Sequence, residues 1–136
     1  MESKIERLSY EQLEPKVIVE LDTTEIMLSD KLADDPAVLA LQISDIEAHH
    51  YRVSYLLTLA EGLLSKARYS AVPKEEGLKL NEAGKKLYME AHTINEELLR
   101  NQLERRLKDI EVRIQVSQSL LAYVREMAKL GGRENT

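Results

Sequence analysis

A long run of mostly apolar residues at alternating steps of four and three most restricts the fold of this chain. The first run has these members: Leu39, Ile43, Ile46, His50, Val53, Leu57, Ala60, Leu64 and Ala67. A second run, in the last third of the chain, has these members: Leu103, Leu107, Ile110, Ile114, Ser117, Leu121, Val124 and Ala128. Both runs follow the a/d spacing of a coiled coil. We therefore expect two long helices, each with a narrow stripe that must be buried.

The composition fits elongated helices in a single domain. The chain has 136 residues, of which 32% are charged and only 4% aromatic, and it has no Trp and no Phe. A compact globule normally fills its core with large aromatic side chains. Cysteine is absent, which excludes disulfides, a thiolate nucleophile and a cysteine zinc site. With no signal peptide and no long apolar segment, we expect no membrane association and a cytoplasmic location, the host cytoplasm if the chain is phage-encoded.

The segment 1–24 is predicted to be an N-terminal arm. Pro15 should end whatever structure precedes it, and the run Lys16-Val17-Ile18-Val19-Glu20-Leu21 has the alternation of a short strand. A single strand cannot form a sheet within its own chain. It is therefore either an extended arm or half of a pair with a second subunit. A short helix capped by Thr23 or Thr24 should follow and run to about Ala33.

The segment 25–132 is predicted to be a helical hairpin. Asp34-Asp35-Pro36 begins a helix that ends near Ser70, before Val72-Pro73. Asn81 should cap a second helix that continues to Leu130, where Gly131-Gly132 supplies a stop, leaving 133–136 as a disordered tail. The apolar register that runs from Leu87 to Leu98 does not continue beyond 100–102, where a second register begins. A bend in the helix or a shift of the apolar stripe is therefore expected there.

The predicted fold class is an all-α, long antiparallel hairpin that forms a homo-oligomer. A hairpin buries only one side of each helix, and further leucines (Leu56, Leu63, Leu99 and Leu120) widen both stripes. The alternative is a monomer whose N-terminal segments cover the hairpin. We assign oligomerisation to the following stripe residues: Leu39, Ile43, Ile46, His50, Val53, Leu57, Leu64, Leu103, Leu107, Ile110, Ile114, Leu121 and Val124.

Metal binding and catalysis are not expected. The Glu47-to-His50 step has the Glu-x-x-His spacing of di-iron bundles, but a full site needs a second copy, and His92 lacks that spacing. We interpret His50 as a polar residue within the first stripe and His49 as solvent-exposed. There is no nucleophile elbow, phosphate-binding glycine loop or pair of catalytic acids, so we predict no enzyme and no cofactor.

The segment 66–86 is the best candidate for function because it carries a net charge of +3, whereas the first 65 residues carry −8. We assign nucleic-acid binding to its cations and its tyrosine: Lys66, Arg68, Tyr69, Lys74, Lys79, Lys85 and Lys86. Cations contact phosphates, and a tyrosine ring stacks on an unpaired base. The alternative interpretation is an ordinary solvated turn, since Glu75, Glu76 and Glu82 dilute the positive charge.

The element order resembles that of small phage recombination mediators of the UvsY type. The similarity covers roughly residues 25–130. It depends on the element order, from a helix beginning PAVLALQISDIEAHHYRVSY to a final helix ending LLAYVREMAKL, on the Lys-Ala-Arg-Tyr step at 66–69 before a basic interruption, and on the late Arg125. This resemblance implies a helical homo-oligomer that binds single-stranded DNA and loads a recombinase onto strands coated by a single-strand-binding protein. It implies contacts through Lys66, Arg68, Tyr69, Lys74 and Lys79. The chain departs from the family in its acidic N-terminal half.

The sequence therefore predicts a non-enzymatic, single-stranded DNA-binding recombination mediator. The alternative function is a structural or adaptor coiled-coil protein, such as a phage assembly component or a chaperone, that does not bind nucleic acid.

Overall fold

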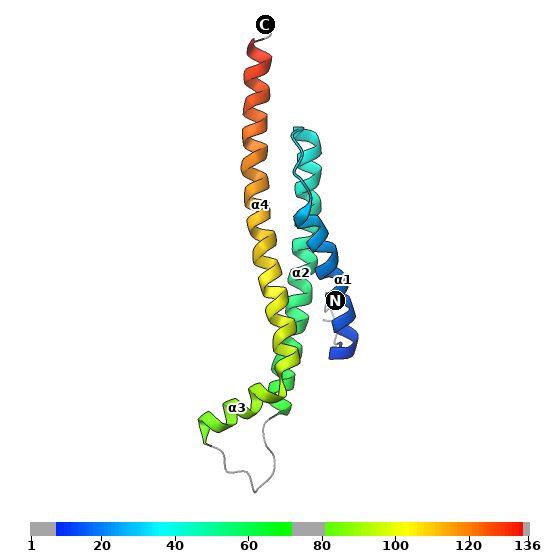
Figure 1. The fold of residues 1–136 in the computed structure, drawn as a ribbon, viewed down its shortest axis with the longest axis vertical. Coiled ribbons are helices and arrows are strands. Elements are labelled where there is room, and N and C mark those ends of the chain that lie inside the picture. Colours follow the sequence, from blue (N-terminus) through cyan, green and yellow to red (C-terminus); the bar gives the residue numbers. More distant parts are fainter. Residues whose placement is uncertain (1–7, 72–80, 135–136) are drawn as a thin grey trace, which may run out of the picture.

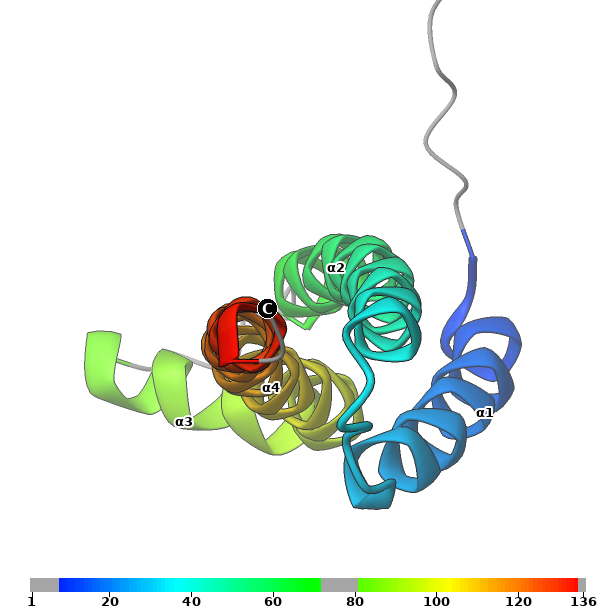
Figure 2. The ribbon, with the colours of Figure 1, turned by 90° about the horizontal axis from the view of Figure 1, so that it is seen from above.

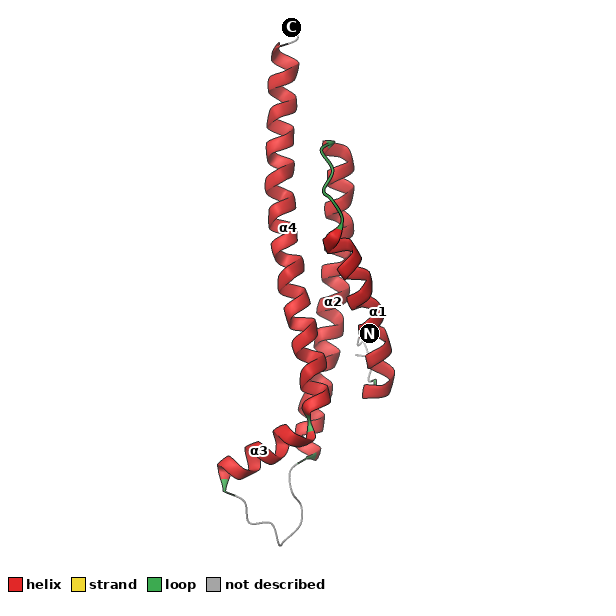
Figure 3. Cartoon of the chain, viewed as in Figure 1, coloured by secondary structure: helices red, strands yellow, loops and turns green. Residues whose placement is uncertain are grey.

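The computed structural model describes residues 8–71 and 81–134, which form four helices and no strand (Figure 1, Figure 3). The bounds of the helices are Tyr10–Ser29 (α1), Pro36–Ser70 (α2), Glu82–His92 (α3) and Ile94–Glu134 (α4). The prediction of an all-α fold is confirmed. The middle of the basic segment, including Lys74 and Lys79, lies outside the described residues.

α2 and α4 run antiparallel and make the most extensive contact in the described chain (Figure 1). The carboxylate of Asp35 caps α2 by accepting a hydrogen bond from the backbone N–H of Val38 at 3.0 Å, and Pro36 occupies the first turn. The predicted helix at 36–70 is confirmed with these ends. α4 is longer than α2, and its C-terminal end extends past the start of α2 (Figure 1).

Residues 16–21 lie within α1, so the strand predicted there is wrong. Ser9 and Gln12 form a capping box, in which each side chain accepts a hydrogen bond from the other residue's backbone N–H. Pro15 lies inside α1 and does not end it. A strand would place Val17 and Val19 on one face, but Val17 is fully buried and Val19 is 64% exposed. The packing of a helical face, Leu13, Val17, Thr24 and Met27, outweighs the weak strand preference of these residues.

α1 packs against both α2 and α4, along one side of the hairpin (Figure 2). The buried apolar core joins all three helices: Leu13, Val17, Met27, Ile46, Val53, Leu56, Leu59, Ala60, Leu99, Leu103 and Ile110. At the edge of this core, the Arg106 guanidinium of α4 lies 2.8 Å from the Glu25 carboxylate of α1. Arg113 donates a hydrogen bond to the carbonyl oxygen of Asp30. The chain thus covers one side of its own hairpin.

The second long helix is interrupted, which corrects the prediction of one helix from residue 82 to residue 130. Asn81 does cap α3, accepting a hydrogen bond from the backbone N–H of Gly84 at 2.7 Å. α3 ends at His92, and Thr93 has the non-helical φ and ψ values of −125° and 21°. The Thr93 side chain is fully buried and donates a hydrogen bond to the carbonyl oxygen of Met89 at 2.7 Å.

The break at Thr93 lies before the point at which the apolar register slips in the sequence. Leu87, Ile94 and Leu98 belong to the first register, and they are 67%, 53% and 55% exposed. The buried face of α4 instead includes Leu99 and Leu103. The slip predicted a bend or a shift of the stripe near residue 101. α4 continues through this region, and its buried face shifts from the register of Ile94 and Leu98 to that of Leu99 and Leu103.

α4 also passes through Gly131-Gly132, which were expected to stop it. The tail predicted for 133–136 is therefore wrong for its first two residues, which belong to α4, while 135–136 lie outside the described residues. A glycine near a helix end weakens the last turn but does not need to terminate it.

Candidate nucleic-acid interface

The end of α2 presents the first part of the predicted nucleic-acid site. Lys66 is exposed, and Tyr69 is 78% exposed, so the tyrosine ring is available for stacking. Arg68 is partly covered, and its guanidinium lies 3.8 Å from the Glu97 carboxylate of α4. Two of these three side chains therefore face solvent, and the third shares its charge with a neighbouring acid.

Lys85 and Lys86 lie apart from this group, on α3. Both are exposed, and the Lys85 ammonium lies 3.8 Å from the Glu82 carboxylate. α3 extends away from the hairpin, and its first turn is further from α2 than its last (Figure 1, Figure 2). The described part of the chain therefore brings Lys66, Arg68 and Tyr69 together but places Lys85 and Lys86 on a separate projection.

An acidic surface borders Lys66 on the side of α1. Lys66 lines an open cavity of about 520 Å³ together with Tyr10, Glu11 and Glu96. A hydrogen bond to Glu14 raises the pKa of Tyr10 to about 12, with burial and the charges of Glu14, Glu96 and Glu11 adding to the shift. Carboxylates here would repel phosphates.

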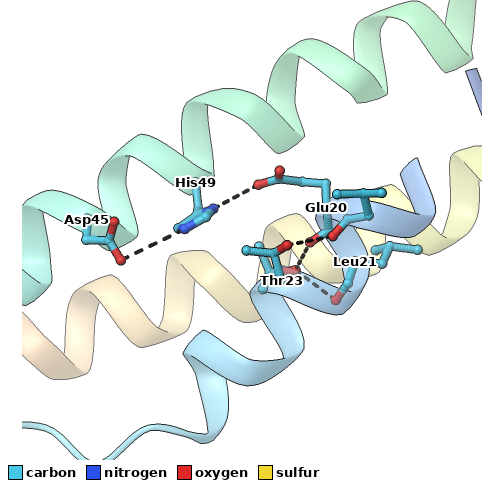
Figure 4. Close-up of polar contacts among 7 residues, drawn as sticks. Glu20, Leu21, Thr23, Asp45 and His49 are labelled. Atoms are coloured by element: carbon cyan, nitrogen blue, oxygen red, sulfur yellow. Dashed lines mark hydrogen bonds and ion pairs between the residues drawn. The ribbon is translucent and has the colours of Figure 1, made fainter. Parts of the chain in front are cut away.

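His49 is a buried polar residue that the sequence interpretation placed in solvent. It is 6% exposed, and its Nδ1 lies 2.8 Å from the Glu20 carboxylate of α1 (Figure 4). Its Nε2 lies 3.9 Å from Asp45, one turn earlier in α2 (Figure 4). An ionised carboxylate only accepts hydrogen bonds, so the ring donates from Nδ1. Glu20 and His49 thus form a polar link between α1 and α2, which no spacing within α2 predicts.

His50 is not the packed stripe residue that we expected. Its side chain is 35% exposed, and its Nε2 lies 3.3 Å from the Glu111 carboxylate of α4. The imidazole therefore lies at the edge of the contact between α2 and α4. His49 is covered instead, because α1 folds as a helix and packs beside it.

The residues assigned to oligomerisation are largely covered within one chain. The fully or nearly buried members are Leu39, Ile43, Ile46, Val53, Leu64, Leu103 and Ile110. The partly buried members are Leu57, Leu107, Ile114, Leu121 and Val124. Contacts with α1, α2 or α4 of the same chain account for this core. The role of these residues in oligomerisation stays a prediction.

Within residues 8–71 and 81–134, no group of three or more histidine and acidic side chains has the arrangement of a metal site. In the same residues, no helix combines the length and the apolar character that crossing a bilayer requires.

Comparisons of the chain with protein-family models, with curated proteins and with solved structures found no match.

Proposed function

We propose that this chain is a non-enzymatic recombination mediator that binds single-stranded DNA as a helical homo-oligomer. The observation that carries the proposal is the exposed pair Lys66 and Tyr69 at the end of α2, next to Arg68 and at the start of the basic segment 66–86. A cation for the phosphates and a ring for the bases are the two components of sequence-tolerant single-strand binding. By the same proposal, the protein partners are a recombinase and a single-strand-binding protein, and the protein acts in the cytoplasm.

The proposal predicts salt-sensitive binding to a single-stranded oligonucleotide, measured by fluorescence anisotropy. Replacing both Lys66 and Arg68 with Glu should abolish binding, because it removes two cations and adds two anions at the site. Replacing Lys31 and Lys129 with Glu makes the same change in net charge at the opposite end of the hairpin, and it should leave binding nearly unchanged. Absence of wild-type binding even at low salt would reject the mediator function.

Glu97 supplies a sharper test, because the structure pairs it with Arg68. Glu97→Gln should free the guanidinium and tighten binding a few-fold. It should also steepen the dependence of log K on log salt, by about 0.7 for each additional phosphate contact on a single strand. An unchanged affinity and slope would show that Arg68 does not contact the nucleic acid.

Tyr69 tests the stacking contact separately from charge. Tyr69→Ala should weaken binding by ~1–3 kcal/mol for each stacked base, whereas Tyr69→Phe should retain most of the affinity, because the ring is kept. Equal losses in both variants would exclude stacking.

The alternative function is a structural or adaptor coiled-coil protein. Specific observations favour it: the ion pairs of Arg68 and Lys85, and the exposed apolar residues Tyr123, Met127 and Leu130 on the free end of α4. An apolar helix face beyond the hairpin is typical of a protein-binding surface. Oligomerisation without any DNA binding in the anisotropy experiment would favour this function.

A further inference from the structure

The face of α2 that points away from the core carries its own regular stripe, which we call the outer stripe. Its nine members repeat at alternating steps of four and three: Ala37, Leu41, Ser44, Ala48, Tyr51, Tyr55, Thr58, Gly62 and Ser65. All nine are exposed. Both α1 and α4 lie on the other side of α2 (Figure 2). The stripe therefore has the spacing of a coiled-coil interface, and its members stay exposed in the described chain.

The composition of the outer stripe is unusual for a surface that faces water. The solvent side of a helix normally carries charged residues, and none of the nine positions does. The large members remain open, with Leu41 73% and Tyr51 74% exposed. The other members are mostly small, which allows a second helix to approach closely. A continuous uncharged face that extends over several heptads is suited to packing against a helix of another molecule.

Gly62 points to the same conclusion. A glycine inside a helix costs about 1 kcal/mol relative to alanine. A Cβ added to Gly62 would meet no atom within 4 Å, so no contact within the described chain requires the glycine. The close approach of a helix from another molecule would supply such a requirement.

The charged residues beside the stripe favour a second copy of α2 as the partner helix, in the parallel orientation. If the stripe occupies positions a and d, Glu47 and Glu61 occupy g positions, while Arg52 and Lys66 occupy e positions. In a parallel, in-register pair, each g residue faces the e residue of the next heptad in the other helix. Glu47 then faces Arg52 of the second copy, and Glu61 faces its Lys66. Twofold symmetry makes each attraction occur twice.

An antiparallel pair would oppose like charges. It would place g residues against g residues, bringing Glu47 near Glu61 of the other helix, and e residues against e residues, bringing Arg52 near its own copy. All four side chains are exposed, and none forms an ion pair with another described residue. They are therefore available for contacts between chains, and their pattern favours the parallel arrangement.

We propose that the outer stripe is a parallel, in-register interface with a second copy of this chain. The inference rests on the homo-oligomer of the proposed function and adds its interface and its orientation. A parallel pair places both copies of Lys66 and Tyr69 at the same end of the assembly. One strand can then contact both copies, so that two weak contacts act together.

The mass of the protein in solution, measured by sedimentation without nucleic acid, tests the interface. Wild type should be a dimer, and Tyr51→Glu should raise the dimer Kd at least about a hundredfold, because two carboxylates would meet in the buried seam. The variant should keep its helical circular dichroism, since Tyr51 is exposed in the single chain. A monomeric wild type at hundreds of micromolar, or an unchanged mass in Tyr51→Glu, would overturn the proposal.

The charged flanks test the orientation. Glu47→Arg should raise the dimer Kd about tenfold, by replacing two attractions with two repulsions. Adding Arg52→Glu should restore the wild-type Kd, because the opposite charges again face each other. In an antiparallel pair, Glu47→Arg would instead relieve the repulsion with Glu61 and tighten the dimer, which would overturn the parallel arrangement.

Cross-linking gives an independent measurement, because the chain has no cysteine. Under mild oxidation, Ser44→Cys should form a covalent dimer, since position 44 faces its own copy only in the parallel register. Asp22→Cys, on the exposed side of α1, is the matched control and should stay largely monomeric. Equal cross-linking of both variants would reject the interface. A dimer that binds no oligonucleotide would reject only the DNA-binding function, and a monomer that binds one would reject only the interface.

Discussion

The two faces of α2 share a periodicity but differ in chemistry. The inner face uses Leu, Ile and Val, and it is buried by α1 and α4 of the same chain. The outer stripe uses Tyr, Ser, Ala, Thr and Gly with a single Leu, and it is exposed. Branched aliphatic side chains gain most from full burial, whereas tyrosine and small residues tolerate water in a free subunit. Both faces thus have the same spacing, and composition distinguishes the buried face from the one that we propose for association.

The largest expected effect on stability comes from introducing the same aspartate substitution on each of the two faces of α2. Ile46→Asp buries an unpaired carboxylate in the core and should lower the free energy of unfolding by at least ~4 kcal/mol, enough to unfold many domains of this size. Leu41→Asp places the same group on the outer stripe and should change the stability of the single chain by less than ~0.5 kcal/mol. Urea denaturation followed by circular dichroism, at a concentration below dimerisation, measures both. Similar losses would show that the two faces are not distinct.

A smaller effect concerns the polar link that holds α1 on the inner side. Glu20→Ala leaves Nδ1 of the buried His49 ring without its acceptor and should cost ~1–3 kcal/mol in the free energy of unfolding. Glu20→Gln keeps an acceptor oxygen and should lose clearly less. Urea denaturation of the two variants measures the difference. Equal losses would indicate that packing of the Glu20 side chain, and not the hydrogen bond, stabilises α1.

The smallest effect concerns the start of α1, where folding raises the pKa of Tyr10 from 10.0 to about 12. Folding thus favours the neutral phenol. The unfolded chain loses this proton first, so the stabilisation is complete below pH 10 and is lost as the pH rises from 10 to about 12. The absorbance titration of wild type minus that of Tyr10→Phe should therefore show one tyrosine ionising near the upper end of this range. Glu14→Ala should lower that pKa, because it removes the hydrogen bond to Glu14, the largest cause of the shift.

Local signals determined much of the fold. Asp35 and Pro36 fixed the start of α2, Asn81 fixed the start of α3, and the four-and-three spacing marked the face of α2 that is buried. These features depend on residues within one or two turns of each other. They act in the same way whatever packs nearby, so the sequence predicts them directly.

The tertiary structure decided the features that depend on residues distant in sequence. Residues 16–21 have strand propensity, but they lie in a helix that packs against α2 and α4, and this packing outweighs the preference of three β-branched residues. Likewise, His49 and His50 are adjacent in the sequence, and only the position of α1 buries the first.

The features of the candidate nucleic-acid site also separate into those that the sequence predicts and those that depend on tertiary contacts. The sequence identified Lys66, Arg68 and Tyr69 as a group, because one turn of helix carries all three. It did not reveal that Glu97 approaches Arg68 or that carboxylates of α1 and α4 border Lys66, since those acids are distant in the chain. Sequence by itself thus determined the starts of α2 and α3, the packing periodicity and the positions of the cations. Tertiary contacts decided which faces are closed and which charges are neutralised, because burial and ion pairing depend on atoms brought together only by folding.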